Sequence, residues 1–256
     1  MLKTTISRKY SSIPDIENTV NGCIANLNSS GEFLFENKRN TIKLFHMEKI
    51  GLDLVVKRYS NKWVDRRLIK AGLKKSKAQK AFENGLLLEK VNISTPSPVA
   101  YVEERNGKHL ISCYYIYMYT EDVSITPLIE QATPDAEAVK ALAAIIARLH
   151  ENGIVHHDIN LSNVLYHNDN GKLEFSLIDI NRMTHTGSGL NENDMNVYLD
   201  DLVRFTGRLD VFLAVAYEYA RIRGFEAEPF VRKLTIKKIR HDANWTRRKK
   251  LHRLFH

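Results

Sequence analysis

The 256-residue sequence has little of several features that define whole classes of protein. Its two cysteines, Cys23 and Cys113, are too few for a disulfide-stapled scaffold and fit a reducing compartment, where we expect packed thiols. Its most apolar run, residues 109–119, is too short to span a bilayer, and its first residues lack the apolar stretch of a secretion signal. With 12 glycines and 6 prolines, it is neither collagen-like nor of low complexity. We therefore expect a folded cytoplasmic protein of one or two domains.

The positive charge is concentrated in two segments. The formal net charge is +8, yet residues 57–80 and residues 231–256 each hold ten Lys or Arg and one Asp, so the rest of the chain carries −10. Such segments attract nucleic acid, anionic lipid or a phosphorylated substrate, whereas a solvated helix face is the simpler explanation for either segment alone. Because there are two segments and no recognised nucleic-acid-binding motif, we favour an anionic partner other than nucleic acid.

The first half of the chain predicts an antiparallel sheet with one main helix. A capping-box pattern, Ser76-x-x-Gln79, begins a helix that ends near Lys90, before the prolines of residues 94–98. Residues 1–31 show little periodicity. Strand-like runs, separated by polar or glycine-containing links, lie at residues 32–35, 41–45, 52–57, 99–103 and 109–118.

The second half predicts mainly helices, so the fold class is α+β. Thr133-Pro134-Asp135 indicates a helix start with Thr133 as the N-cap, and apolar residues then recur at helical spacing up to Asn152. We place the boundary between a first domain, 1–119, and a second domain, 120–256, beside Met118. The other elements predicted are strands at 163–166 and 173–179 and helices at 196–205, 208–223 and within 229–256.

The densest group of acids, amides and histidines is a loop of the form His-x-Asp-x-x-x-x-Asn. It runs from His156 through Asp158 to Asn163, and the second strand of the following hairpin leads to Asp179. Phosphoryl transfer needs a carboxylate that orients the attacking hydroxyl and accepts its proton, together with hard oxygen ligands for a divalent cation. Asp158 has the position of that base, and Asn163 and Asp179 supply amide and carboxylate oxygens. The pattern predicts metal-dependent phosphoryl transfer.

A lysine near the end of the third strand adds to this set. Lys57 can reach the α- and β-phosphates of a nucleotide, and such a lysine needs an anion that fixes its rotamer. Glu83 and Glu89 are the candidates in the next helix, and we choose Glu83 because it borders the apolar stripe of that helix. The simpler alternatives are a solvated lysine, an ordinary surface acid, and turn-forming roles for Asn163 and Asp179.

The order of strand lysine, helix glutamate, His-x-Asp-x-x-x-x-Asn and Asp-x-Asn resembles the protein-kinase-like superfamily. Further segments narrow this resemblance; they are residues 39–41, 55–59, 76–78, 95–100 and 178–182. They resemble the lipopolysaccharide core kinases, which are the Kdo/heptose kinase or WaaP/InaA-like family. The similarity extends over roughly residues 30–205.

The resemblance implies a two-lobed protein-kinase-like fold and an activity. ATP, with Mg²⁺, would donate its γ-phosphate to a hydroxyl of Kdo or heptose in the inner core of lipopolysaccharide. Lys57 and Glu83 would anchor the phosphates, Asp158 would be the base, and Asn163 and Asp179 would bind the metal. The substrate would be the lipid A-core glycolipid, and the basic segments would hold the enzyme peripherally on the cytoplasmic face of the anionic inner membrane.

The sequence departs from the protein-kinase pattern in ways that bear on the substrate. The glycine-rich loop is absent, and we predict that Lys38 and Arg39 cover the nucleotide phosphates instead. We add Met118, at the domain boundary, to the predicted nucleotide-binding residues. No Ala-Pro-Glu motif follows Asp179, and residues 184–196 are short and rich in Gly and Asn, which favours a small hydroxyl acceptor over a protein.

Two alternatives remain open at this point. The first is a phosphotransferase of the same fold that acts on another small molecule or on protein. The second is a basic protein of this fold that binds a partner without catalysis. The presence of Lys57, Asp158, Asn163 and Asp179 together argues against the second, because a degenerate kinase is expected to lose at least one of them.

Overall fold

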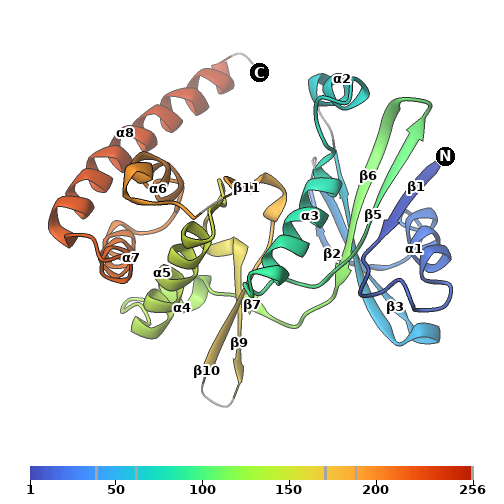
Figure 1. Ribbon diagram of the computed structural model, residues 1–256, viewed down its shortest axis with the longest axis horizontal. Coiled ribbons are helices and arrows are strands. Elements are labelled where there is room, and N and C mark those ends of the chain that lie inside the picture. Colours follow the sequence, from blue (N-terminus) through green and yellow to red (C-terminus); the bar gives the residue numbers. More distant parts are fainter. Residues whose placement is uncertain (38–39, 61–62, 170–171, 188, 255–256) are drawn as a thin grey trace. The chain divides into compact units, whose positions relative to one another are not determined.

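Figure 1 shows the computed structural model, which describes residues 1–37, 40–60, 63–169, 172–187 and 189–254. Their contacts divide the chain into two compact units. The first unit holds Met1–Glu121 together with Asp179–Arg182, and the second holds Asp122–Ile178 and Met183–His256. The segment that begins at Asp179 therefore belongs, by its contacts, to a unit that is remote from it in sequence.

The first unit is built on a six-stranded antiparallel sheet, and five of its strands correspond to the runs that the sequence predicts. The strand order is β1-β5-β6-β4-β3-β2, and β6 has the predicted bounds, His109–Met118. The edge strand β1 was not predicted from the sequence. The other strands are β1 (Leu2–Ile6), β2 (Glu32–Glu36), β3 (Asn40–Met47), β4 (Leu52–Tyr59) and β5 (Pro98–Asn106), and the short 3-10 turn η1 is Glu48–Ile50.

Helices cover both faces of this sheet. The helix α1 (Ile16–Ala25) packs its apolar side on one face, in a buried cluster with Leu54 and Val56 of β4. The helix α3 (Lys77–Lys90) packs against β4, β5 and β6. Because side chains alternate along a strand, Lys57 points away from the face that Val56 covers and toward the α3 face. A further helix, α2 (Trp63–Lys70), lies in the first basic segment and was not predicted.

The two cysteines are buried thiols of this unit. Cys23 lies on α1 within the core cluster, and Cys113 lies on β6 with no exposed surface. Burial raises the pKa of the Cys23 thiol to about 11. The prediction of packed thiols is confirmed.

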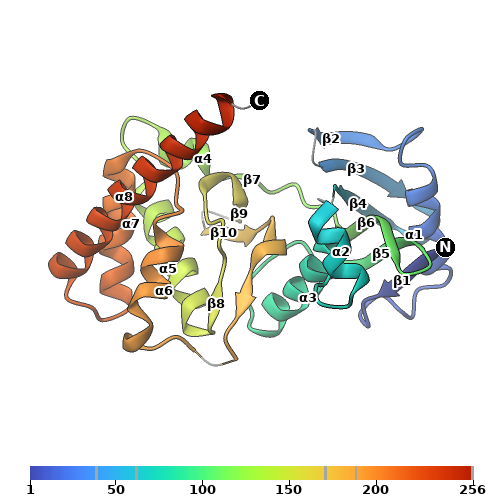
Figure 2. The ribbon, with the colours of Figure 1, turned by 90° about the horizontal axis from the view of Figure 1, so that it is seen from above.

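The second unit is mainly helical. In it α7 packs against both α5 and α8 (Figure 2). A small sheet has the order β10-β9-β7, and a second pairs β11 with β8. The helices are α4 (Thr126–Glu130), α5 (Ala136–Glu151), α6 (Met195–Leu202), α7 (Leu209–Ile222) and α8 (Ala227–Leu254). The strands are β7 (Val123–Ser124), β8 (Ile154–Val155), β9 (Val164–Asp169), β10 (Lys172–Leu177) and β11 (Thr184–His185), and the 3-10 turns are η2 (Leu161–Asn163) and η4 (Glu192–Asp194).

The start of α5 differs from the prediction. Asp135, not Thr133, is the N-cap, and its carboxylate accepts a hydrogen bond from the Ala138 N–H at 2.8 Å. A carboxylate cap interacts favourably with the positive end of the helix dipole. This explains why the helix begins after Asp135 and not after Thr133. The predicted end is confirmed, since Asn152 is the C-cap and Gly153 has the left-handed conformation, with φ 68°, that follows many helix ends.

The helix α8 uses part of the second basic segment for its own packing. The ammonium of Lys238 is buried and donates to the carbonyl oxygens of Val203 and Phe205 and to the carboxylate of Asp242, at 2.9–3.2 Å. Lys237 pairs with Asp200 at 2.9 Å. These two cations therefore fix α8 within its unit rather than serving a partner. None of the helices in the part of the chain that is described has the length and apolar character needed to cross a membrane.

Candidate active site

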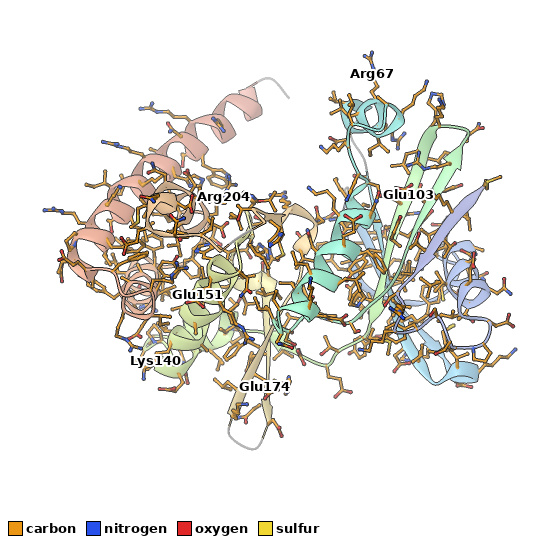
Figure 3. The ribbon with its side chains drawn as sticks, in the orientation of Figure 1. Arg67, Glu103, Lys140, Glu151, Glu174 and Arg204 are labelled. Carbon is orange, nitrogen blue, oxygen red and sulfur yellow. The ribbon has the colours of Figure 1, made fainter. Side chains whose placement is uncertain are left out.

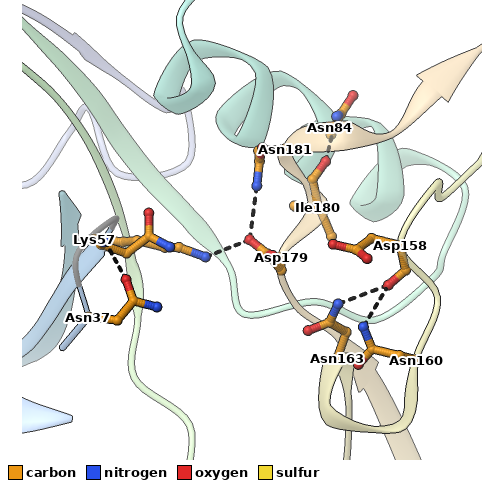
Figure 4. Close-up of polar contacts among 10 residues, drawn as sticks. Asn37, Lys57, Asn84, Asp158, Asn160, Asn163, Asp179, Ile180 and Asn181 are labelled. Carbon is orange, nitrogen blue, oxygen red and sulfur yellow. Dashed lines mark hydrogen bonds and ion pairs between the residues drawn. The ribbon is translucent and has the colours of Figure 1, made fainter. Parts of the chain in front are cut away.

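Two of the predicted site residues, Lys57 and Asp179, meet in the first unit (Figure 4). The Lys57 ammonium lies 2.7 Å from Oδ1 of Asp179, and the Asn181 amide donates to the same oxygen at 2.9 Å. The Lys57 side chain is only 10% exposed, and its ammonium lies 5.1 Å from the centre of the Tyr59 ring. The partly desolvated pair thus presents a fixed cation beside a carboxylate.

The position of Asp179 depends on the short segment that contains it. The strand β10 ends at Leu177, so Asp179 lies beyond the strand and not at its end as predicted. It has the left-handed conformation, with φ 55°, which turns the chain into the 3-10 helix η3 (Ile180–Arg182). The Asn84 side chain on α3 donates to the Ile180 carbonyl at 2.7 Å and ties η3 to α3. A non-glycine residue at positive φ is costly and is maintained where its surroundings determine it, as at many functional sites.

Asp179, the partner of Lys57, lines a polar cavity of about 500 Å³ in the first unit. Its lining includes Asn37, Tyr59, Lys77, Asp179 and Arg182. Burial, and secondarily the charge of Asp179, raise the pKa of the Tyr59 phenol, which therefore stays neutral. Because cations and amides line the cavity, it suits the phosphate groups of a nucleotide.

The predicted loop from His156 to Asn163 lies in the second unit and is closed on itself. The Asn163 amide donates to the backbone carbonyl of Asp158 at 2.9 Å, and the Asn160 amide donates to the same oxygen at 3.3 Å. Asn163 is 8% exposed, in the turn η2. Since its Nδ2 is used on Asp158, its Oδ1 is the atom with which it can bind a cation. The carbonyl of Asn163 also accepts from the Ile178 N–H, directly before Asp179.

A buried carboxylate that the sequence analysis missed anchors this loop. Asp201 of α6 has no exposed surface and accepts from the backbone N–H groups of His156 and His157 at 3.0 and 2.6 Å. It also lies 3.2 Å from Nε2 of His150, whose Nδ1 lies 2.7 Å from the hydroxyl of Tyr219. Burial alone would raise the pKa of Asp201, but the hydrogen bond from His150 and the other contacts together hold it below its ordinary value. The carboxylate is therefore ionised and fixes the loop that carries Asp158.

The sequence did contain a signal for Asp201. Tyr198, Asp201 and Leu202 stand at helical spacing and are all buried in α6. An acid on the apolar side of a helix has to find hydrogen-bond donors in the interior, because an unpaired buried charge is too costly. Such a position therefore indicates a structural or functional anchor.

The structure does not bring Glu83 to Lys57. Glu83 accepts from Lys75 at 2.7 Å and from Gln79 at 3.1 Å, and the second candidate, Glu89, accepts from Ser97 at 2.6 Å. The cation of Lys57 is held by Asp179 instead. A role for Glu83 in anchoring phosphates thus stays a prediction.

The other predicted nucleotide-binding residues are placed as follows. Met118 ends β6, where its N–H donates to the Ser97 carbonyl at 2.9 Å and its side chain packs against the core of the first unit. Lys38 and Arg39 lie outside the described residues. Their predicted contacts with a nucleotide therefore stay predictions.

The donor atoms suit a hard divalent cation. Within the described ranges, no group of three or more His, Cys, Asp or Glu side chains is placed to hold a metal ion. Mg²⁺, however, is usually bound by one or two protein oxygens together with substrate phosphates and water. The carboxylate of Asp179 and the Oδ1 of Asn163 are each donors of that kind, and the role of either one in metal binding stays a prediction.

Comparisons with known proteins give the family and the fold. The sequence matches the profile of the lipopolysaccharide kinase (Kdo/WaaP) family over residues 28–211. The fold is similar to that of WaaP in a complex with acyl carrier protein, with a TM-score of 0.62 and 15% identity, over 93% of this chain and 98% of that one. The Rio2 kinase of Chaetomium thermophilum, in a complex with ADP, Mg²⁺ and phosphoaspartate, gives a TM-score of 0.49 and 17% identity over 92% and 71% of the two chains.

A comparison with curated protein sequences gives no significant match. The similarity to WaaP confirms the predicted α+β, kinase-like fold.

Proposed function

Because the chain belongs to the lipopolysaccharide kinase (Kdo/WaaP) family, we propose that it transfers the γ-phosphate of ATP to a sugar hydroxyl of the lipopolysaccharide core. The observation that carries this proposal is the ion pair of the buried Lys57 with the half-buried Asp179. A fixed cation beside a carboxylate, at a polar cavity, is the arrangement that a nucleotide and its divalent ion require.

Each predicted site residue has its own role in the proposed reaction. Lys57 holds the phosphates that are not transferred, and Asp158 orients the attacking hydroxyl and accepts its proton. Asn163 and Asp179 hold Mg²⁺, which neutralises the charge of the phosphate oxygens when it is bound.

We infer that the acceptor is a hydroxyl of Kdo or heptose in the inner core. The family match supports this class of acceptor. The segment after Asp179 supports it as well, since it reaches α6 at Met195 through η3, β11 and η4. A protein kinase of the usual kind places a longer activation segment there.

The decisive experiment uses the purified chain, ATP, Mg²⁺ and core oligosaccharide. Mass spectrometry should show one added phosphate, and fragmentation should place it on Kdo or on heptose. An unmodified oligosaccharide, together with transfer to another hydroxyl compound or to protein, would replace the proposed acceptor. Absence of ATP turnover with every acceptor tested would contradict a catalytic role.

Replacement of Lys57 by Met should weaken ATP binding about 10-fold or more. Hydrogen bonds to charged groups contribute about 1.5–3 kcal/mol, and the variant removes the ammonium while it keeps an apolar stem. The KM for ATP should rise and the KM for the acceptor should stay the same. Lys90→Met, at the exposed end of α3, is the control. An unchanged KM for ATP in the Lys57 variant would exclude a phosphate-anchoring role.

We further propose that exposed cations hold the enzyme on an anionic membrane surface at the cytoplasmic side. The side chain of Arg67 points away from α2 (Figure 3), and Arg66, Arg67 and Lys70 line a groove of about 860 Å³ together with Lys108 and His109. Arg247 and Arg248, toward the end of α8, are exposed as well.

Replacement of Arg247 and Arg248 by Gln should weaken binding to anionic liposomes about 30-fold, at ~1 kcal/mol for each cation near the surface. Binding of the unmodified chain should also fall as salt is added. Point variants are required because Phe230, Leu234 and Lys238 of the same helix are buried, so that removal of the helix would expose core. Lys140→Gln with Lys172→Gln, two exposed cations outside the basic segments, is the control. Equal liposome binding by the two double variants would contradict docking through α8.

A further inference from the structure

A small pocket of about 150 Å³ lies beside η3 in the first unit. Five cations line it, with Asp65 as its one acid; they are Lys74, Lys75, Lys77, Lys80 and Arg182. We call it the cation pocket. It adjoins the larger polar cavity, because Asp65, Lys77 and Arg182 line both, but Asp179, the partner of Lys57, lines the larger cavity and not the cation pocket.

Contacts within the protein account for part of this charge. Lys74 pairs with Asp65 at 2.6 Å, Lys75 pairs with Glu83 at 2.7 Å, and Lys77 donates to the Ser60 carbonyl at 2.7 Å. Lys80 differs from them. Across the described parts of the chain its ammonium makes no hydrogen bond and no ion pair, although the charge of Asp65 in the same pocket acts on it.

The surroundings of Lys80 are unfavourable for its charge. Burial, and then the nearby charge of Lys74, lower the pKa of Lys80. An anion in the pocket would offset both effects, since it supplies a hydrogen-bond acceptor and a compensating charge. The pocket also lies at the N-terminal end of the 14-residue helix α3, where the helix dipole favours a negative group.

We propose that the cation pocket binds an anionic group, a phosphate or a carboxylate, that the acceptor carries. The inference rests on the proposed function and makes it more specific. Lys57, held by Asp179 at the larger cavity, serves the nucleotide phosphates, so the ammonium of Lys80 is left for a second anion. The acceptor is therefore a sugar that is already acidic or already phosphorylated, and the pocket rejects neutral sugars.

The test compares Lys80→Met with the wild-type chain on two acceptors, namely core oligosaccharide and the same material after dephosphorylation and reduction of its carboxylates. For the charged acceptor, the KM should rise about 10-fold or more in the variant. For the neutralised acceptor, both proteins should show the same high KM, and the KM for ATP should not change. Lys80→Arg should restore the KM of the charged acceptor, and Lys90→Met on the same helix should resemble the wild type.

Each other outcome overturns a defined part of the inference. An increase in the KM for ATP alone would assign the cation pocket to the nucleotide. If the wild-type chain phosphorylates core oligosaccharide and Lys80→Met has the same KM for it, the cation pocket does not bind the acceptor. The proposed function would then stand. A wild-type chain that transfers no phosphate to the core would overturn both. The Tm of Lys80→Met should equal or exceed that of the wild type, because the lost charge is not paired within the protein.

Discussion

Replacement of Asp158 by Asn should lower kcat by about 10²–10⁴-fold, the usual contribution of a positioned general base. The amide keeps the shape of the side chain but cannot accept the proton of the attacking hydroxyl. The loop should keep its structure, because Asn163 and Asn160 donate to the backbone carbonyl of residue 158 and not to its carboxylate. The Tm and the affinity for ATP should therefore match those of the wild type.

Single-turnover rates with saturating ATP and acceptor measure this effect directly. Glu151→Gln, at the exposed end of α5 (Figure 3), is the control for loss of a nearby carboxylate. A single-turnover rate in Asp158→Asn within a few-fold of the wild type would show that another group accepts the proton. A low Tm in this variant would instead assign Asp158 to the stability of the loop.

Replacement of Asp201 by Ala should destabilise the second unit by several kcal/mol and abolish transfer. The change leaves three donors in the interior without their acceptor, namely the backbone N–H groups of His156 and His157 and the ring of His150. Each buried donor without a partner costs about 1–3 kcal/mol, against a total stability of about 5–15 kcal/mol for a domain. Urea unfolding followed by circular dichroism measures the loss.

The neighbouring acid provides a matched control. Asp200 is 64% exposed and pairs with Lys237 on the surface, so Asp200→Asn should change the free energy of unfolding by less than about 1 kcal/mol. The variant Asp201→Asn keeps one acceptor oxygen and the side-chain volume, so it should lose less stability than Asp201→Ala. The transfer rate of this better-folded variant then reports the effect of Asp201 on catalysis. If Asp200→Asn and Asp201→Ala unfold at the same urea concentration, the buried carboxylate does not anchor the loop.

The contribution of Asp201 should depend on pH in a defined direction. Its pKa is lower in the folded state than its ordinary value, so folding favours the ionised form. The contribution is therefore fully present above the unfolded pKa of about 3.9 and is lost as the pH falls through the lower, folded value. The difference in unfolding free energy between the wild type and Asp201→Asn should stay constant at neutral pH and shrink only in strong acid.

The part of the site that the sequence predicts is the part that local spacing encodes. Short-range patterns in the sequence identify the loop from Asp158 to Asn163 and the strand lysine, Lys57. In the structure Lys57 pairs with Asp179, which is 122 positions away in the sequence. The partner of Lys57 was predicted as Glu83, because the spacing of a helix shows which face an acid occupies but not how far that face lies from a strand. That distance depends on η3, which Asn84 ties to α3.

In the fold, too, the elements that local sequence patterns mark are the ones that were predicted. The strand β6 and the helix α3 are predicted closely, since alternation of apolar residues and a Ser76 cap mark them locally. The edge strand β1 was missed because its short Leu-Lys-Thr-Thr-Ile run is stable only when paired with β5. The helix α1 was also not predicted, because residues 1–31 were judged to show little periodicity. Its buried apolar residues do recur at helical spacing, but the N-cap Asp15 is left-handed and its side chain makes no capping hydrogen bond, so the usual signal of a helix start is missing.

The burial of both native thiols makes the chain a convenient subject for spectroscopy. With Cys23 inside the α1 cluster at a pKa of about 11, and Cys113 on β6 without exposed surface, maleimide dyes should leave the native cysteines unmodified in the folded protein. A cysteine introduced on the surface of each unit would then be the only reactive position in that unit. Dye pairs attached there would report, by energy transfer, whether ATP and acceptor change the distance between the two units during a catalytic cycle.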